Sequence, residues 1–384
     1  MHHHLRFARV AALLLAVALP NVSFADVTPV GPEFVVNSPD QAGLPYGIDF
    51  YDVAMAPDGS FAVVWAHAAK VVSGVTLRSE IVMRRFAADG SPLAPEQKVN
   101  IPQDDSHAPS IAWSPQGGYV VAWSDDEIGA VLARHYQRDG SGMGLLPIVV
   151  EPRSSAETSV AVRDNGDFAV TWSDDGDVKA RGFTRQGIPY GKFFKVASTG
   201  LRQVFPDIAS GSDGKFTVTW QGDGIYRRRC GIAGLALEPA ERIDSSSPYP
   251  GMLPSIANNA SGDQVIVWQN DHIFARRYGA LGSPLDSIGF DVGSTNSNSG
   301  APAAAFVDPV GSLTIAWTSY EADYTAHVRA RTYDPSGVAR GPSFLVGGQW
   351  SVIPHIAGDS QGNFVVVWSY VDGGPILARL YRHP

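Results

Sequence analysis

The chain has 384 residues, of which 44% are hydrophobic and 17% are charged, and its formal net charge at pH 7 is −9. This apolar fraction excludes an intrinsically disordered chain, because such chains lack the hydrophobic residues that offset the entropy lost on folding. The acidic balance argues against a nucleic-acid partner, since binding to phosphates needs a basic surface. We therefore expect a folded protein that binds no nucleic acid.

The first 25 residues have the pattern of a secretory signal peptide. Two arginines lie within residues 1–9, an apolar run covers residues 10–19, and Ser23-Phe24-Ala25 places small residues where a signal peptidase cuts. The run is too short to span a bilayer, although an uncleaved anchor stays the alternative. The sequence thus predicts a bacterial protein that is periplasmic or secreted, with no membrane insertion after signal cleavage. Cys230 is the only cysteine, so no intramolecular disulfide can form and stability must come from the core.

A unit of about 50 residues recurs seven times along the chain, which is the signature of a repeat architecture. Each copy has an alanine, then a glycine, then a tryptophan six residues after the glycine, and later an arginine followed two residues on by an aromatic residue or, once, by cysteine. The tryptophans are Trp65, Trp123, Trp172, Trp220, Trp268, Trp317 and Trp368. The arginines are Arg84, Arg134, Arg181, Arg228, Arg276, Arg331 and Arg379.

Each copy reads as four short strands, A to D, separated by turns. In the last copy strand A covers residues 354–357, strand B is Phe364–Trp368 with strict alternation, and strand C is Ile376–Tyr381. Residues 342–346 illustrate strand D in the copy before it. Seven such units predict an all-β, seven-bladed β-propeller of four-stranded antiparallel blades. A solenoid or a row of sandwiches would share the period.

The last copy lacks strand D, and a matching segment stands near the start of the chain. Residues 31–37 (Gly-Pro-Glu-Phe-Val-Val-Asn) match residues 341–347 (Gly-Pro-Ser-Phe-Leu-Val-Gly). We expect the N-terminal strand to complete the last blade and close the ring, which removes exposed strand edges and which a solenoid would not need. Residues 26–384 are therefore expected to form a single domain.

The runs Gly-x-Phe-x-Val-x-Trp, Ala-Arg-x-Tyr-x-x-x-Gly and Gly-Pro-x-Phe-x-Val resemble the repeat of secreted bacterial seven-bladed β-propellers. The resemblance covers residues 30–384 and implies the fold. It implies no single function, since such propellers include lectins, adhesion parts, scaffolds and a few enzymes. Turns such as Asp359-Ser360-Gln361-Gly362 lack the Asp-x-Asp-x-Asp-Gly spacing of the calcium loops in integrin-like propellers.

The repeated tryptophans and arginines are expected to be structural. The tryptophans share a strand face with phenylalanine and valine, which favours a place between blades over a role as sugar platforms. The arginines are expected to satisfy carbonyl groups or stack on aromatic rings between blades, with anion binding as the alternative.

Strand A carries a polar residue in six copies, close to the expected mouth of the central channel. Among these residues, Asp52, Asp207 and His355 are candidates for general acid–base chemistry. Asp52 and His355 belong to the first and last blades, which are neighbours in a closed ring. The alternative is that these side chains bond to the backbone of the next inner strand.

The loops between strands B and C and between D and A share one face of a propeller, and here they are acidic. Asp174, Asp177, Glu321 and Asp323 are candidate calcium ligands on this rim. Asp126, Asp175, Asp271 and His272 are candidate ligand contacts, and Asp40, Asp104 and Asp372 belong to the same acidic set. The alternative is that aspartates simply suit solvated turns.

Aromatic residues outside the repeat are further candidates for ligand contact, because loops on a rigid scaffold commonly carry function. These are Trp350, Tyr320, Tyr324 and Tyr249. The first and sixth copies also have long expected loops, at residues 66–80 and 318–327.

Catalytic motifs with a fixed spacing are missing from the sequence: it has no Gly-x-Ser-x-Gly, no His-Glu-x-x-His and no Gly-x-x-x-x-Gly-Lys. The leading hypothesis is an exported, monomeric, non-catalytic binding or scaffold protein that uses the loop-rich face for a glycan or protein ligand. The alternatives are an exported hydrolase or lyase with an acid/His site at the channel mouth, and a structural ring with Ca²⁺ on its rim. No other cofactor is expected.

Overall fold

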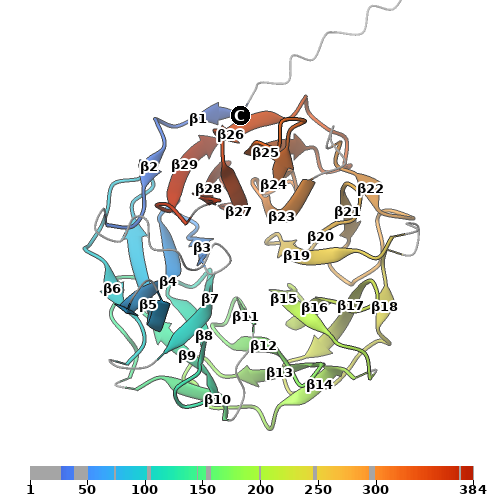
Figure 1. The fold of residues 1–384 in the computed structure, drawn as a ribbon. Helices are drawn as coiled ribbons and strands as arrows, with labels where there is room; N and C mark the ends of the chain where they lie inside the picture. Colours follow the sequence, from blue (N-terminus) through green and yellow to red (C-terminus); the bar gives the residue numbers. More distant parts are fainter. Residues whose placement is uncertain are drawn as a thin grey trace, which may run out of the picture.

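The computed structural model describes residues 27–38, 51–72, 75–101, 105–144, 146–152, 157–198, 200–244, 249–293, 299–371 and 373–383. The predicted signal peptide and Asp40, Asp104 and Asp372 lie outside these residues. The described chain is all-β and forms seven sheets arranged as a ring, with one strand of each sheet beside the central axis (Figure 1). In this part of the chain, no helix has the length and apolar character that crossing a membrane requires.

Seven blades follow one another around the ring, and each runs from an inner to an outer strand. Blade 1 is β3 (Tyr51–Met55), β4 (Phe61–Val72), β5 (Val75–Phe86) and β6 (Gln97–Lys98). Blade 2 is β7 (Ser106–Trp113), β8 (Tyr119–Asp125), β9 (Ala130–Tyr136) and β10 (Ile148–Pro152). Blade 3 is β11 (Thr158–Val162), β12 (Phe168–Asp174), β13 (Asp177–Phe183) and β14 (Phe194–Ala197). Blade 4 is β15 (Val204–Ser210), β16 (Lys215–Gln221), β17 (Ile225–Gly231) and β18 (Glu241–Arg242).

Blades 5 to 7 repeat the same order. Blade 5 is β19 (Met252–Asn258), β20 (Gln264–Gln269), β21 (Ile273–Tyr278) and β22 (Phe290–Asp291). Blade 6 is β23 (Ser299–Phe306), β24 (Leu313–Tyr320), β25 (Ala326–Tyr333) and β26 (Phe344–Gly347). Blade 7 is β27 (Ser351–Gly358), β28 (Asn363–Tyr370) and β29 (Leu377–Arg382), with β1 (Thr28–Pro29) and β2 (Phe34–Val35) on its outer edge. The predicted seven-bladed propeller is confirmed.

The N-terminal strand completes the last blade, as the sequence predicts. Phe34 of β2 lies opposite Ala378 of β29, and the backbone amide of Val36 donates to the carbonyl of Ile376 over 2.8 Å. Val36 is fully buried, and the Phe34 ring lies 5.6 Å from the ring of Phe86 in blade 1. The opening segment therefore closes blade 7 and also packs against the blade next to it.

The repeated tryptophans and arginines hold the blades together. All seven tryptophans have at most 3% of their surface exposed. Arg181 shows the role of the arginines: its Nη1 donates to the carbonyl of Val150 in the preceding blade over 2.7 Å, and its guanidinium lies 5.5 Å from the centre of the Phe183 ring. Equivalent bonds to the preceding blade are made by Arg84, Arg134, Arg228 and Arg331. The structural interpretation of the repeated tryptophans and arginines is confirmed.

Five inner strands have, at their second or third residue, a positive φ followed by proline, a pairing that backbone sterics disfavour. These residues are Ala108, Phe205, Leu253, Ala301 and Ile353, with φ between 47° and 52°. Blades 1 and 3 have Tyr51 and Thr158 in place of the proline. The Tyr51 hydroxyl donates to the carbonyl of Ile353, and the Thr158 hydroxyl donates to that of Ala108 over 2.6 Å. In these two places, the residue that replaces proline in one blade thus bonds to the strained residue of the preceding blade.

The long loop expected at residues 66–80 is wrong. Strand β4 runs on to Val72 and β5 starts at Val75, so most of this segment is a β-hairpin. Its β-branched residues favour an extended backbone and explain the difference. In blade 6, β24 ends at Tyr320 and β25 begins at Ala326, which leaves a loop of residues 321–325 only.

Candidate functional site

Asp52 and His355, predicted to be neighbours, meet where blade 7 faces blade 1. Nδ1 of His355 lies 3.3 Å from Oδ1 of Asp52, and the imidazole ring lies 5.0 Å from the Tyr51 ring. The other carboxylate oxygen of Asp52 accepts the amide of Ile111 over 2.9 Å and the hydroxyl of Ser110 over 3.1 Å, both in blade 2. The carboxylate therefore links three blades, which agrees with the structural interpretation of this strand position.

Asp207 has a similar environment but belongs to another part of the ring. Its Oδ1 accepts the Ser159 hydroxyl of blade 3 over 2.7 Å and the amide of Ile208, and its Oδ2 accepts the amide of Ile256 in blade 5 over 2.8 Å. Enclosure by the inner strands raises the pKa of Asp207, against the opposing effect of these three donors. Its bonds join blades 3 to 5, whereas Asp52 and His355 join blades 7, 1 and 2.

The four candidate calcium ligands lie in two separate blades and already have partners. Asp174 and Asp177 stand at the hairpin between β12 and β13, and Glu321 and Asp323 lie between β24 and β25. Their partners are Lys179, Lys195, Arg329 and the hydroxyl of Thr325, in that order. Within the described ranges, no group of three His, Cys, Asp or Glu side chains could hold a metal ion. The described residues assemble no calcium site at these positions.

The remaining polar candidates stand on turns of three different blades. Asp126, Asp175 and Asp271 are exposed, and His272 is partly exposed. Asp126 pairs with His107 at 3.4 Å, and His272 lies 3.7 Å from Asp291. The structure does not bring the four candidates into one cluster.

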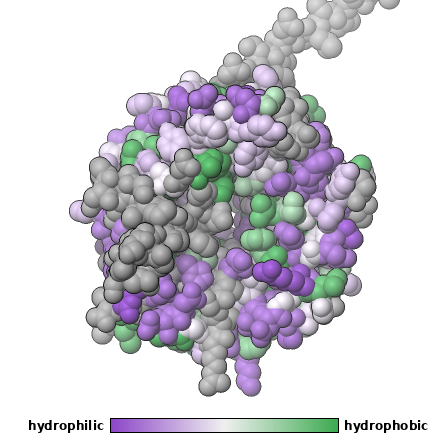
Figure 2. Space-filling model, in the orientation of Figure 1, coloured by the Kyte–Doolittle hydropathy of each residue, from purple (hydrophilic) through white to green (hydrophobic). Residues whose placement is uncertain are grey.

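The aromatic candidates outside the repeat are exposed, as expected. The exposed fractions are 49% for Trp350, 39% for Tyr320, 80% for Tyr324 and 61% for Tyr249. Trp350 and Tyr324 also have positive φ angles of 67° and 65°, which are costly for bulky residues. Exposed apolar side chains also stand at the starts of inner strands, among them Phe205 at 39% and Met252 at 41%. Figure 2 shows hydrophobic residues near the centre of the ring and a mostly hydrophilic periphery.

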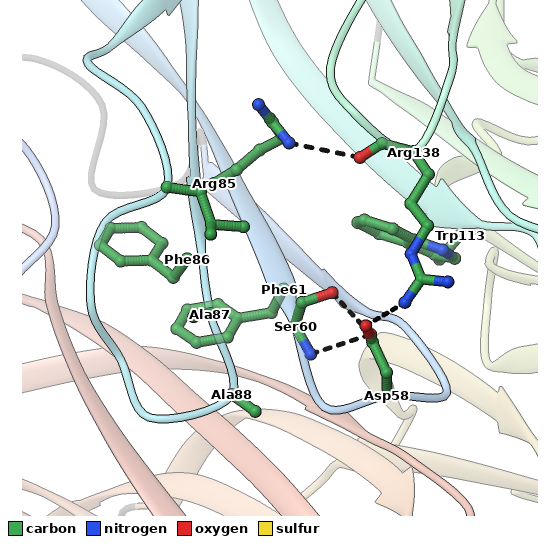
Figure 3. Close-up of a pocket in the computed structure, with 10 residues that line it drawn as sticks. Asp58, Ser60, Phe61, Arg85, Phe86, Ala87, Ala88, Trp113 and Arg138 are labelled. Carbon is green, nitrogen blue, oxygen red and sulfur yellow. Dashed lines mark hydrogen bonds and ion pairs between the residues drawn. The ribbon is translucent and has the colours of Figure 1, made fainter.

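A cleft that the sequence did not reveal lies between blades 1 and 2, on the face formed by the A–B and C–D turns. A pocket of about 240 Å³ has Trp113, Arg138, Asp58 and Arg85 in its walls (Figure 3). A second pocket of about 220 Å³ shares Trp113, Arg138 and Asp58 with the first. Both are on the face opposite to the loop-rich one.

Trp113 occupies a strand position that no other blade fills with tryptophan. It is the last residue of β7, and the equivalent residues are Met55, Val162, Ser210, Asn258, Phe306 and Gly358. Its ring lies 4.9 Å from the ring of Tyr119, and its side chain is partly exposed. Like Trp350, Trp113 is not one of the seven tryptophans that recur at the same position of each copy. This departure from the repeat is the sequence signal that could have identified it.

An ion pair between neighbouring blades lies beside Trp113. Arg138, in the turn after β9, donates from Nη2 to Oδ2 of Asp58, in the turn after β3. The Ser60 hydroxyl donates to the other Asp58 oxygen over 2.7 Å. Partial burial acts to raise the pKa of Asp58, but the bonds from Ser60 and Arg138 outweigh it and the pKa is lowered. The cleft therefore presents a charged acceptor, a charged donor and an indole side by side.

No protein-family model matches this chain, and no curated protein matches it. Among solved structures, the chain is similar to a protein of unknown function from Dyadobacter fermentans, with TM-score 0.55 and 13% identity over 93% of this chain and 99% of that one. It is similar to a polysaccharide lyase, the ulvan lyase PL25, with TM-score 0.54 and 11% identity over 89% and 94%. It is also similar to U3-55K, with TM-score 0.53 and 13% identity over 91% and 98%. At these identities the likeness shows the fold alone: the chain is a seven-bladed β-propeller.

Proposed function

We propose that this propeller is an exported, non-catalytic binding protein that holds a saccharide in the cleft between blades 1 and 2. The observation that carries the proposal is the partly exposed ring of Trp113 beside the Asp58–Arg138 ion pair. A sugar ring has an apolar face of C–H groups and an edge of hydroxyl groups. An indole suits the face, while an acceptor and a donor held side by side suit neighbouring hydroxyls.

The charges around the cleft favour a neutral saccharide. Arg138 is offset by Asp58, with which it forms an ion pair. Arg85 lies near Asp139, whose pKa is lowered mainly by hydrogen bonds from Ser141 and to a smaller extent by the Arg85 charge. Because Arg138 is paired with Asp58 and Arg85 has Asp139 nearby, the positive charge left to select an anionic sugar is small.

The same groups favour binding over catalysis. A general acid or base works best when its pKa lies near the working pH. Asp58 has a lowered pKa and stays ionised at neutral pH, and Arg138 is permanently charged. Both side chains are suited to fixed hydrogen bonding and not to proton transfer.

A second candidate function is hydrolysis or elimination at the channel mouth. The observation in its favour is the 3.3 Å contact between His355 Nδ1 and Asp52 Oδ1, because a carboxylate bonded to one ring nitrogen orients the other for proton transfer. Under this hypothesis, His355→Ala would abolish turnover of a polysaccharide while the fold stays intact.

A glycan array, followed by incubation of the bound glycans with the protein, tests the proposal. We expect saturable binding to neutral glycans that does not depend on added Ca²⁺ and releases no product over time. Failure to bind any neutral glycan would contradict the proposed function. Time-dependent product formation that His355→Ala abolishes would favour the second candidate.

A further inference from the structure

We infer that the ligand is a linear saccharide of at least two units that lies across the cleft, rather than a single sugar. This inference rests on the proposed function and specifies the ligand of the same site. It comes from the relation between the two pockets, which share Asp58, Trp113 and Arg138 but otherwise have different walls.

The volume of each pocket limits the size of the ligand that it can hold. At about 240 Å³ and 220 Å³, each pocket is smaller than the roughly 300–1,000 Å³ typical of a small-molecule site. The two together fall within that range. A ligand that uses the whole cleft must therefore extend from one pocket into the other.

The two pockets share three of the residues that line them. Trp113 and the Asp58–Arg138 ion pair belong to both linings, so the two pockets adjoin at these side chains. Figure 3 shows the three side chains together in the wall of the first pocket. A saccharide that passes this junction brings hydroxyls from two successive units within reach of one carboxylate and one guanidinium. The side chains of Asp58 and Arg138 are 47% and 60% exposed, so both can accept further partners while they stay paired.

The outer ends of the pockets differ in chemistry. The first pocket extends along the C–D turn of blade 1, where Ala88 and Leu93 form its wall, and Leu93 is 52% exposed. The second extends to the A–B turns of blades 2 and 7, where Gln116 and Gln361 are part of its lining. Nε2 of Gln361 donates to the carbonyl of Pro57 over 2.9 Å, which fixes this side of the cleft.

This difference predicts how two units are arranged. One unit rests on the aliphatic wall at Leu93, and the other is bonded by the amides at Gln116 and Gln361. Because the aliphatic and amide ends are separate, the cleft has a direction, and reversal of the chain would place hydroxyls against Leu93. We therefore expect a neutral disaccharide to bind in one orientation.

Calorimetric titration of the full chain tests the inference. The probes are glucose, galactose, mannose and N-acetylglucosamine, each with its 1,4-linked homodisaccharide. The variants are Gln116→Ala and Leu93→Ala, one from each end of the cleft, and both replace side chains on exposed turns. We expect at least one disaccharide to bind tenfold or more tightly than its monosaccharide. Both variants should weaken binding of the disaccharide. One of them should leave the affinity for the monosaccharide unchanged, because a single sugar occupies one pocket only.

The outcomes separate the inference from the proposed function. Equal affinity of a monosaccharide and its disaccharide would overturn the two-unit ligand and keep the saccharide site. A disaccharide affinity that neither variant changes would also overturn the two-unit ligand. If no probe binds, or if binding persists in Trp113→Ala, the proposed function itself fails.

Discussion

Nδ1 of His355 and Oδ1 of Asp52 lie 3.3 Å apart and join the last blade of the ring to the first. The same carboxylate oxygen accepts the amide of Val53 over 2.8 Å, and the other one accepts two donors from blade 2. Asp52 thus accepts three hydrogen bonds and contacts His355 at the place where the ring closes. We therefore expect substitution of Asp52 to lower the free energy of unfolding.

Asp52→Ala should destabilise the protein more than His355→Ala. The aspartate change leaves the Ile111 amide and the Ser110 hydroxyl without their acceptor, and unpaired buried groups cost about 1–3 kcal/mol. The histidine change removes a partly exposed contact with Asp52, worth about 0–1 kcal/mol, together with the contact of the imidazole with the Tyr51 ring, and it leaves no buried donor unpaired. Urea unfolding at neutral pH measures both. Equal losses would show that Asp52 does not act through blade 2.

Asp207 gives a pH dependence of known sign. Its folded-state pKa is raised above the ordinary 3.8, so above pH 3.8 the folded protein holds a proton that the unfolded chain has lost. The contribution of Asp207 to the free energy of unfolding should therefore fall as the pH rises through this window.

The matched variant is Asp207→Ser, since serine stands at this position in blades 2, 3 and 5. The difference in unfolding free energy between wild type and Asp207→Ser should decrease from pH 4 to pH 7. Asp58→Ser is the control of opposite sign, because the pKa of Asp58 is lowered and its contribution is lost on acidification. A difference that stays flat or rises for Asp207 would contradict its enclosed environment.

Deletion of residues 33–37 should remove the closure of the ring. The deletion takes away the fully buried Val36, the Phe34 ring and the ladder bonds to β29. One buried valine contributes about 1.5–3 kcal/mol and each net hydrogen bond about 1, so we expect a loss of about 3–5 kcal/mol. Val35→Ala, at a side chain 44% exposed, is the control and should change stability by less than about 1 kcal/mol. A deletion that melts within a degree or two of wild type would refute closure.

Calcium should leave the melting temperature unchanged. Asp174 and Asp177 are paired with lysines, and Glu321 with Arg329, so a divalent ion would have to displace cations that are already bound. Thermal unfolding with millimolar CaCl₂ and with EDTA measures the effect. A clear rise with CaCl₂ that is lost in Asp177→Asn would instead support a structural ring with calcium on its rim.

The features that repeat could be predicted from the sequence. The buried tryptophans, the arginine bonds between blades and the closing strand all follow from comparing copies within one chain, because each copy meets the same environment. The contact of Asp52 with His355 could be predicted for a related reason: both occupy one repeat position, in blades that closure makes neighbours.

The cleft could not be predicted in this way, because it departs from the repeat. It depends on Trp113 in one blade, on Asp58 in the blade before it and on the conformation of the Arg138 side chain, which columns of the repeat do not encode. Loop composition alone predicts an acidic rim, but the cations that pair with its carboxylates, Lys179, Lys195 and Arg329, come from strands β13, β14 and β25. The positive φ before proline does have a sequence signal, because a proline stands three residues before the repeated alanine in five copies. An analysis of strand periodicity alone does not detect this signal.

The most direct test compares Trp113→Ala with Trp350→Ala in titrations of the neutral saccharide that binds best. Both tryptophans are at least partly exposed, both lie outside the repeat, and they stand on opposite faces of the ring. Loss of an aromatic platform should cost about 1.4 kcal/mol or more, which is tenfold in Kd. We expect that loss for Trp113→Ala and an unchanged Kd for Trp350→Ala. Loss of binding in Trp350→Ala with full affinity in Trp113→Ala would place the saccharide site on the loop-rich face and contradict a site in the cleft between blades 1 and 2.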